Sequence, residues 1–194
     1  MMKKNLYIAV LFTMVTTVLF GLIYPLVFTG IAQLLFPGKA DGQLIRQNGN
    51  LIGSKIIGQP FTGPGYFHSR PSAAGTGYDA SASGGSNLAP TNHQLLDRVA
   101  ADVKKLESEN PGVPVPVDLV TTSASGLDPD ISPAAAEFQI PRIVRERHIS
   151  ESELRALVAQ HTQNRQLEIF GEPRVNVLEL NLALDALGTP AKQN

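Results

Sequence analysis

The chain has 194 residues and no cysteine, and its 16 lysines and arginines against 17 aspartates and glutamates give a net charge of -1 at neutral pH. The absence of cysteine excludes a disulfide framework, a thiol nucleophile and any zinc or iron–sulfur site with cysteine ligands. The balanced charge argues against a nucleic-acid partner, which requires a basic face. If one segment lies in a membrane, the remainder fits a single domain of ordinary size.

Residues 5–38 carry no charged side chain and are dominated by leucine, valine, isoleucine and phenylalanine. A bilayer core requires about 20 apolar residues in a helix, so the sequence predicts a cytoplasmic tip and a single transmembrane helix within residues 1–38. A cleaved signal peptide is the alternative, but it has a shorter apolar region and a small-residue cleavage site, and this segment has neither feature. Pro25 lies well inside the span and should kink the helix, either against lipid or to fit a partner helix.

The charges around this span predict its orientation. Lys3 and Lys4 precede it, whereas Lys39 is closely followed by Asp41. Positively charged residues favour the cytoplasmic side of a membrane. We therefore expect the N-terminus in the cytoplasm and residues 39–194 in an extracytoplasmic soluble domain.

A β-hairpin and a long loop are expected at the start of that domain. The segment QLIRQNGNLIGSKIIGQ contains Asn48-Gly49, a dipeptide that tolerates the positive φ angles of a tight hairpin turn. Residues 60–90 are rich in glycine, proline, serine and alanine and have no helical or strand period. Loops of this length are either disordered or functional. The embedded aromatic residues favour an ordered loop that docks against something; they are Phe61, Tyr66, Phe67 and Tyr78.

Capping signals predict the helices that follow. Thr91 with Gln94 forms a capping box before an amphipathic stretch that ends near Asn110. Ser132-Pro133 starts a second helix, with serine as the cap and proline at the first helical position. Pro141 should break or kink this helix, because proline lacks the backbone donor that the helix interior requires.

Two more helices are expected towards the C-terminus. Ser150 with Glu153 forms a capping box for a helix that continues to about Gln163. The last apolar segment has both strand and helix periodicity, and we predict a helix there because Asn176 can cap it and Glu179 follows three residues later.

Two short segments have strand character. Residues 115–120 alternate as a strand should, although Pro116 demotes them to an edge or a bulge. Residues 167–170, LEIF, have high β propensity, and Gly171 should end the strand. Short strands interleaved with helices predict an α+β fold: one N-terminal transmembrane helix followed by a small mixed α+β extracytoplasmic domain.

Sequence motifs for catalysis or metal binding are missing. The four histidines lack the spacing that places two imidazoles on one metal ion, and no window matches the G-x-S-x-G motif of serine hydrolases. We therefore assign no catalytic residue and no metal site. Asp128 and Asp130 either attract a cation or favour the N-terminus of the following helix. The SGGSN run either cradles an anion with its backbone amides or forms a plain turn; its residues are Ser83, Gly84, Gly85, Ser86 and Asn87.

Several long and unusual blocks resemble, in order, the C subunit of the bacterial Kdp potassium pump. They are YPLVFTGIAQLLFPGKADGQLI, GSKIIGQPF, YFHSRPSA, SGGSNLAPTN, VDLVTTSASGLDPDISPAAAEFQ and GEPRVNVLELN. The resemblance runs from the membrane span nearly to the end of the chain. Asp130 departs from it, since many relatives are expected to have a histidine there.

The resemblance implies an accessory, non-catalytic subunit in the bacterial inner membrane. Its partners would be a channel-like A subunit that selects potassium, a P-type ATPase B subunit that hydrolyses ATP, and the small F subunit. The subunit would have no cofactor of its own, because ATP and potassium are handled by the complex. The family is also described as a catalytic chaperone that raises the ATP affinity of the B subunit, but ATP is cytoplasmic and the expected orientation places SGGSN outside.

We expect the outward domain to dock on the external mouth of the A subunit. The expected contact residues, besides the SGGSN run, are Tyr66, Phe67, His68 and Arg70. Asp128 and Asp130 would favour cation approach or cap a helix. A different class of function stays open at this point, namely a membrane-anchored extracytoplasmic module that binds a small ligand in the glycine-rich loop.

Overall fold

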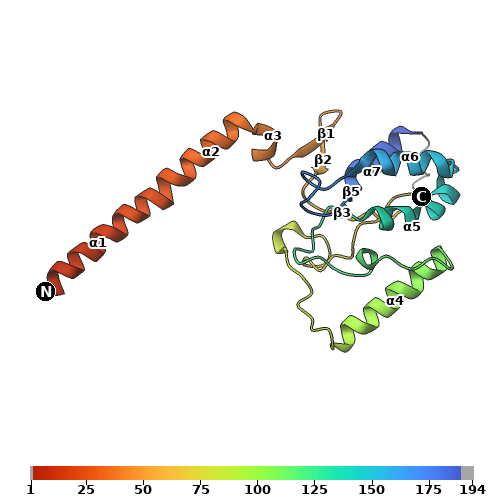
Figure 1. Ribbon diagram of the computed structural model, residues 1–194, viewed down its shortest axis with the longest axis horizontal. Coiled ribbons are helices and arrows are strands. Elements are labelled where there is room, and N and C mark those ends of the chain that lie inside the picture. The colour runs from red at the N-terminus through yellow and green to blue at the C-terminus, as the bar shows by residue number, and fades with distance from the viewer. Residues whose placement is uncertain (1, 189–194) are drawn as a thin grey trace. The chain divides into compact units, whose positions relative to one another are not determined.

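The computed structural model describes residues 2–188, and the chain divides into two compact units, Met1–Ile52 and Gly53–Asn194. Figure 1 shows both units, and each is described by itself.

An apolar helix forms most of the first unit. It consists of α1 (Met2–Val18), a π-helical turn η1 (Leu19–Ile23) and α2 (Tyr24–Leu35). The most apolar 18-residue window of Met2–Leu35 has a mean hydropathy of 2.3, and none of that window is buried inside the protein. At about 1.5 Å per residue it exceeds the roughly 30 Å thickness of a bilayer core. The expected single N-terminal apolar helix, long enough to span a membrane, is confirmed.

The π-helical turn lies directly before Tyr24-Pro25. In an α-helix the ring of Pro25 would collide with the carbonyl group four residues earlier, at Gly21, and that carbonyl would lose its donor. Gly21 lies within η1. A wider turn at this point relieves the collision, which gives the irregular geometry a local cause.

A short helix and a hairpin follow the apolar helix. After α3 (Pro37–Ala40), strands β1 (Leu44–Gln47) and β2 (Asn50–Ser54) pair in a two-stranded sheet. Asn48 and Gly49 have φ angles of 51° and 81°. The predicted hairpin and its turn are therefore confirmed.

The second unit is built around a small antiparallel sheet with the order β3-β5-β4. Its strands are β3 (Asp130–Ile131), β4 (Thr162–Gln163) and β5 (Arg174–Asn176). Helices α5 (Pro133–Arg147), α6 (Glu151–His161) and α7 (Val177–Ala186) gather around it in Figure 1. The buried core comes mainly from these elements and includes Ile140, Ile143, Leu154, Val175, Leu180 and Leu184.

Most helix starts follow the sequence signals. The side chain of Ser132 accepts a hydrogen bond from the Ala135 N–H, and Asn176 accepts one from the Glu179 N–H. The capping box of Ser150 is also present. These three predictions are confirmed. In the last apolar segment, Val175 belongs to strand β5, and helix α7 begins directly after Asn176. The segment that had both periodicities therefore contains both elements.

Two predicted helix boundaries are wrong, and one expected helix break is absent. Helix α4 (His93–Glu109) is capped by Asn92, whose side chain accepts from the Gln94 N–H, and not by Thr91. Of the two outcomes expected at Pro141, a break or a kink, the break is absent, because α5 continues to Arg147. Helix α6 ends at His161, because the next two residues pair with β5 as strand β4.

The two predicted strands outside the sheet are also wrong. Residues 115–120 contain a 3-10 turn, η3 (Val117–Leu119), because Pro116 cannot donate to a strand ladder and its φ angle suits the entry to a turn. Residues 167–170 form a turn closed by a bridge between Gln166 and Phe170. The long loop contains only one short element, η2 (Ala80–Ala82), among the residues that the structure describes.

Replacing Pro141 by alanine should stabilise the protein. Proline in a helix interior is about 3 kcal/mol less favourable than alanine, and about 1 kcal/mol is offset because proline also restricts the unfolded chain. Thermal unfolding of the full chain in detergent, followed by circular dichroism, should therefore show a gain of about 1–2 kcal/mol. Pro133→Ala at the first helical position is the matched control and should give no gain. A loss of stability in Pro141→Ala would show that its ring makes packing contacts worth more than the restored hydrogen bond.

Candidate functional site

Two buried side-chain amides fix the centre of the long loop. Asn181 on α7 accepts from the Phe67 N–H through Oδ1 and donates from Nδ2 to the Phe67 carbonyl, both at 2.9 Å. Gln139 on α5 does the same for His68, accepting from its N–H at 2.7 Å and donating to its carbonyl at 3.1 Å. Each amide thus supplies the donor and acceptor that a neighbouring β-strand would supply.

Two arginines of α5 hold the residues just before this point. Arg142 donates to the carbonyl oxygens of Pro64 and Tyr66, and its guanidinium pairs with Glu109 at the end of α4 at 3.1 Å. Arg147 donates from Nε to the Gly65 carbonyl at 2.6 Å and from Nη2 to Asp185 at 2.7 Å. The guanidinium carbon of Arg147 also lies 4.4 Å from the centre of the Tyr66 ring. The path of the loop is therefore set by side chains of α5 and α7.

The expected contact residues of this part of the loop have different exposures. Tyr66 and His68 are half-buried, whereas the side chain of Phe67 is 0% exposed and belongs to the hydrophobic core. Phe67 therefore offers no surface to a partner, and its role is packing. Burial, followed by the nearby charge of Arg142, lowers the pKa of His68, whose Nε2–H donates to the Gly63 carbonyl at 2.9 Å.

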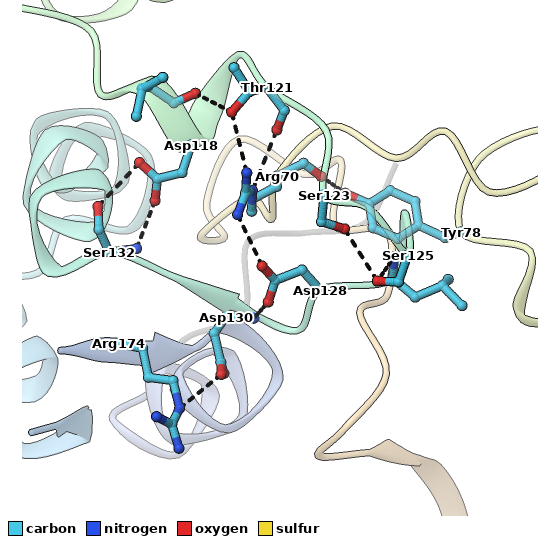
Figure 2. Close-up of polar contacts among 12 residues, drawn as sticks. Arg70, Tyr78, Asp118, Thr121, Ser123, Ser125, Asp128, Asp130, Ser132 and Arg174 are labelled. Carbon is cyan, nitrogen blue, oxygen red and sulfur yellow. Dashed lines mark hydrogen bonds and ion pairs between the residues drawn. The ribbon is translucent and has the colours of Figure 1, made fainter. Parts of the chain in front are cut away.

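Arg70 joins the loop to the segment that contains Asp128, and Figure 2 shows its guanidinium between Thr121 and Asp128. Its Nη1 lies 3.1 Å from Asp128 Oδ2, while Nη2 donates to Thr121 Oγ1 at 3.3 Å. The hydroxyl of Tyr78 donates to the Arg70 carbonyl at 2.5 Å. Both ends of Arg70 are thus fixed within the domain.

The two aspartates are each paired with an arginine. Asp128 binds Arg70 and also accepts from the Asp130 N–H at 3.0 Å. Asp130 lies 3.1 Å from Arg174 and accepts from the Asn176 side chain at 3.1 Å. Burial raises the pKa of Asp130 despite these two partners. The N-cap of the following helix is Ser132, which in turn donates to Asp118 from its N–H at 2.7 Å and from its hydroxyl at 3.2 Å.

These charged groups line an open depression of about 330 Å³. It brings together residues from the loop, η3, β3 and the entry to β5, so three of the expected site residues meet there. Its lining is Arg70, Asp118, Asp128, Asp130, Ile131, Ser132, Glu172, Pro173 and Arg174.

The SGGSN run packs against a second small-residue segment. The Gly84 N–H and the Ser83 hydroxyl both donate to the Ser125 carbonyl, at 2.8 and 3.0 Å. Gly126 has a φ angle of +67°, and a Cβ there would lie 2.6 Å from the Gly84 carbonyl oxygen, so glycine is required by this close approach. The Ser72 hydroxyl donates to the Gly126 carbonyl at 2.6 Å. The start of the run is therefore held by hydrogen bonds within the domain, while Ser83 and Asn87 stay exposed.

Four residues that organise the site were not among the expected ones: Gln139, Arg142, Arg147 and Asn181. A signal for the amides is present in the sequence, because Gln139 and Asn181 lie among the apolar residues that form the buried faces of their helices. A buried polar residue requires partners. Among residues 2–188, no group of three or more histidines, aspartates and glutamates is placed to hold a metal ion.

The described residues thus combine one apolar N-terminal helix, long enough to span a membrane, with a small domain of helices and short strands. The sequence model of the family described as "KdpC: K+-transporting ATPase, c chain" matches residues 6–186. A protein of Koribacter versatilis named "Potassium-transporting ATPase KdpC subunit" is 66% identical over 184 residues, which cover 95% of each chain. A protein of the same name from Acidobacterium capsulatum is 58% identical over 95% of this chain and 99% of its own length. Another, from Methylobacterium nodulans, is 57% identical over 88% of this chain and 91% of its own length. The chain therefore belongs to the KdpC family.

Asn181→Leu should destabilise the domain strongly. The substitution keeps the side-chain volume but leaves the buried N–H and carbonyl of Phe67 unpaired, at a cost of about 1–3 kcal/mol each. The free energy of unfolding of the full chain in detergent should fall by about 2–5 kcal/mol. The same substitution at the exposed Asn164 should change it by less than about 0.5 kcal/mol. An equal effect at both positions would mean that the amide of Asn181 does not hold the loop.

Proposed function

We propose that this chain is the accessory, non-catalytic C subunit of an ATP-driven potassium import complex. The family match carries the proposal, because it covers residues 6–186 and thus includes both the apolar helix and the small domain. The proteins from Koribacter, Acidobacterium and Methylobacterium are all named as subunits of a potassium-transporting ATPase. The helix anchors the chain in the bacterial inner membrane, and the domain stabilises the assembly of the other subunits.

In this proposal the channel-like A subunit selects potassium, the P-type B subunit hydrolyses ATP, and the small F subunit completes the complex. The domain docks on the external mouth of the A subunit through the surface around Tyr66, His68 and Arg70. Contacts within the domain hold these residues before any partner arrives. The guanidinium of Arg147 lies over the Tyr66 ring, Gln139 hydrogen-bonds the backbone of His68, and Asp128 pairs with Arg70. A surface that is ordered in advance loses less conformational entropy on binding.

Asp128 and Asp130 contribute to this surface by balancing the charges of Arg70 and Arg174. Carboxylates that are already paired with arginines suit docking against a polar protein surface better than capture of a free cation. An effect of the subunit on the ATP affinity of the B subunit would then pass through contacts between subunits, because the domain lies outside and ATP lies inside.

Co-purification tests the assembly. A tagged full-length chain, recovered from detergent-solubilised membranes of potassium-starved cells, should bring with it a multi-span subunit and a P-type ATPase with potassium-stimulated hydrolysis. Membranes without the tagged chain give the background. Recovery of the chain alone, from membranes shown to contain the pump, would contradict the proposal and favour a free-standing module that binds a small ligand.

Cysteine labelling tests the orientation, because the chain has no cysteine of its own. Ala156 is exposed on α6, in the domain, and Met2 is the first residue of the apolar helix. In intact spheroplasts a membrane-impermeant maleimide should label Ala156→Cys but not Met2→Cys, which should react only after permeabilisation. The reverse pattern would place the domain in the cytoplasm and allow it direct contact with ATP.

A further inference from the structure

The turn between β4 and β5 exposes three large apolar side chains in a row of four residues. Leu167, Ile169 and Phe170 are 82%, 70% and 62% exposed. The turn is nevertheless ordered by its own backbone, since the Gln166 N–H donates to the Phe170 carbonyl at 2.8 Å and the Phe170 N–H donates back at 2.9 Å. We call residues 167–170 the apolar turn.

The backbone of the apolar turn is strained. Leu167 and Glu168 have φ angles of 52° and 64°, in the left-handed region that costs an ordinary side chain about 1–2 kcal/mol. The hairpin turn of the first unit has similar angles but uses Asn48-Gly49, the residues that adopt them most readily. The chain therefore keeps a bulky leucine at a position where asparagine or glycine would relieve strain, while its side chain packs against little of its own domain.

We propose that the apolar turn is a contact surface that buries Leu167, Ile169 and Phe170 against an apolar patch on the extracytoplasmic face of a multi-span subunit of the same complex. The proposal rests on the proposed function, which places such a subunit beside the domain. It adds a contact that is separate from the residues of the long loop.

The size of the apolar turn favours a partner that is already held nearby. Three such side chains form a patch on the order of 400 Å², about half of what each partner contributes to a stable interface of standard size. A second copy of this chain, meeting only through this patch, would not be held firmly. A subunit of the same membrane complex is kept at high effective concentration by the membrane helix, so a small apolar contact is sufficient there.

Charge argues against a lipid surface as the occupant. Glu168 lies between the apolar side chains, and its carboxylate would have to enter the bilayer with them, at high cost. Arg165 is paired with Glu172 at 2.5 Å, so the base of the turn adds no net positive charge that would attract anionic lipids. A protein surface can instead offer a donor to Glu168 beside an apolar patch.

The apolar turn also adjoins the depression described above. Glu172, Pro173 and Arg174, which closely follow it in the chain, line that depression together with Arg70 and Asp128. An apolar centre next to a polar margin is the usual composition of a protein interface. One partner surface can therefore cover the turn and reach the paired charges of the depression.

Site-specific photo-cross-linking in the assembled complex identifies the occupant. With Phe170→p-benzoylphenylalanine in the tagged full-length chain, irradiation should produce a covalent adduct with the multi-span subunit. Leu96 on α4 is 50% exposed and is the control position, which should not give this adduct. An adduct with lipid, an adduct with a second copy of the chain, or no adduct in an intact complex would each overturn the proposal. Failure to recover any complex before irradiation would instead contradict the proposed function.

Polar substitution gives an independent measurement. Leu167→Ser combined with Ile169→Ser should weaken retention of the partner subunits about five-fold or more, as expected for the loss of apolar anchor residues. Leu96→Ser, the matched change at an exposed leucine elsewhere, should leave retention unchanged. The melting curves of both variants should equal that of the parent chain, because the replaced side chains are exposed. Unchanged retention in the double variant would overturn the proposal.

Discussion

The pairing of buried side-chain amides with the backbone of Phe67 and His68 is the constraint on which the second unit depends. The long loop has almost no regular structure, yet Phe67 is buried in the core. A buried backbone must find donors and acceptors, and among the described residues no strand pairs with this segment to supply them. Asn181 and Gln139 provide them from two helices, and Arg142 and Arg147 satisfy the carbonyls just before. An irregular segment can therefore be part of the core.

This constraint requires α5 and α7 to start at fixed places, and the small sheet fixes both starts. In the register of β3 with β5, Asp130 lies opposite Asn176, the residue that caps α7. Ser132, which caps α5, follows directly after β3. Strands of two and three residues are sufficient because each leads straight into a capped helix. The sheet thus positions the amides and arginines that hold the loop.

The same bonds explain what kind of surface the domain offers. Arg70, Arg147 and Arg174 are each paired with an aspartate of the domain. Such pairs orient side chains and balance charge, and they leave the burial of apolar surface as the main driving force for association. The apolar turn, next to the depression, exposes apolar surface of that kind. In the proposed complex, this combination of a rigid polar margin and a small apolar patch suits association with another subunit.

The sequence by itself determined the features that depend on neighbouring residues. The length of the apolar run indicated the membrane helix, Asn48-Gly49 the hairpin turn, and the capping residues Ser132, Ser150 and Asn176 the helix starts. These signals are read from a few adjacent positions, because a cap or a tight turn is completed by backbone groups within four residues. The six blocks that resemble the family were also readable without a structure, and they pointed to the KdpC family.

Only the tertiary structure decided which side chains meet across long separations in the sequence. It placed Phe67 in the core, 114 residues from the asparagine that holds its backbone. It also turned residues 167–170, a strand by local propensity, into an exposed turn, because the neighbours of β5 are β3 and β4. Local propensity is worth only about 1 kcal/mol per residue, whereas burial and the pairing of buried polar groups stabilise a fold by more. Burial and pairing of this kind arise only when the whole domain is assembled.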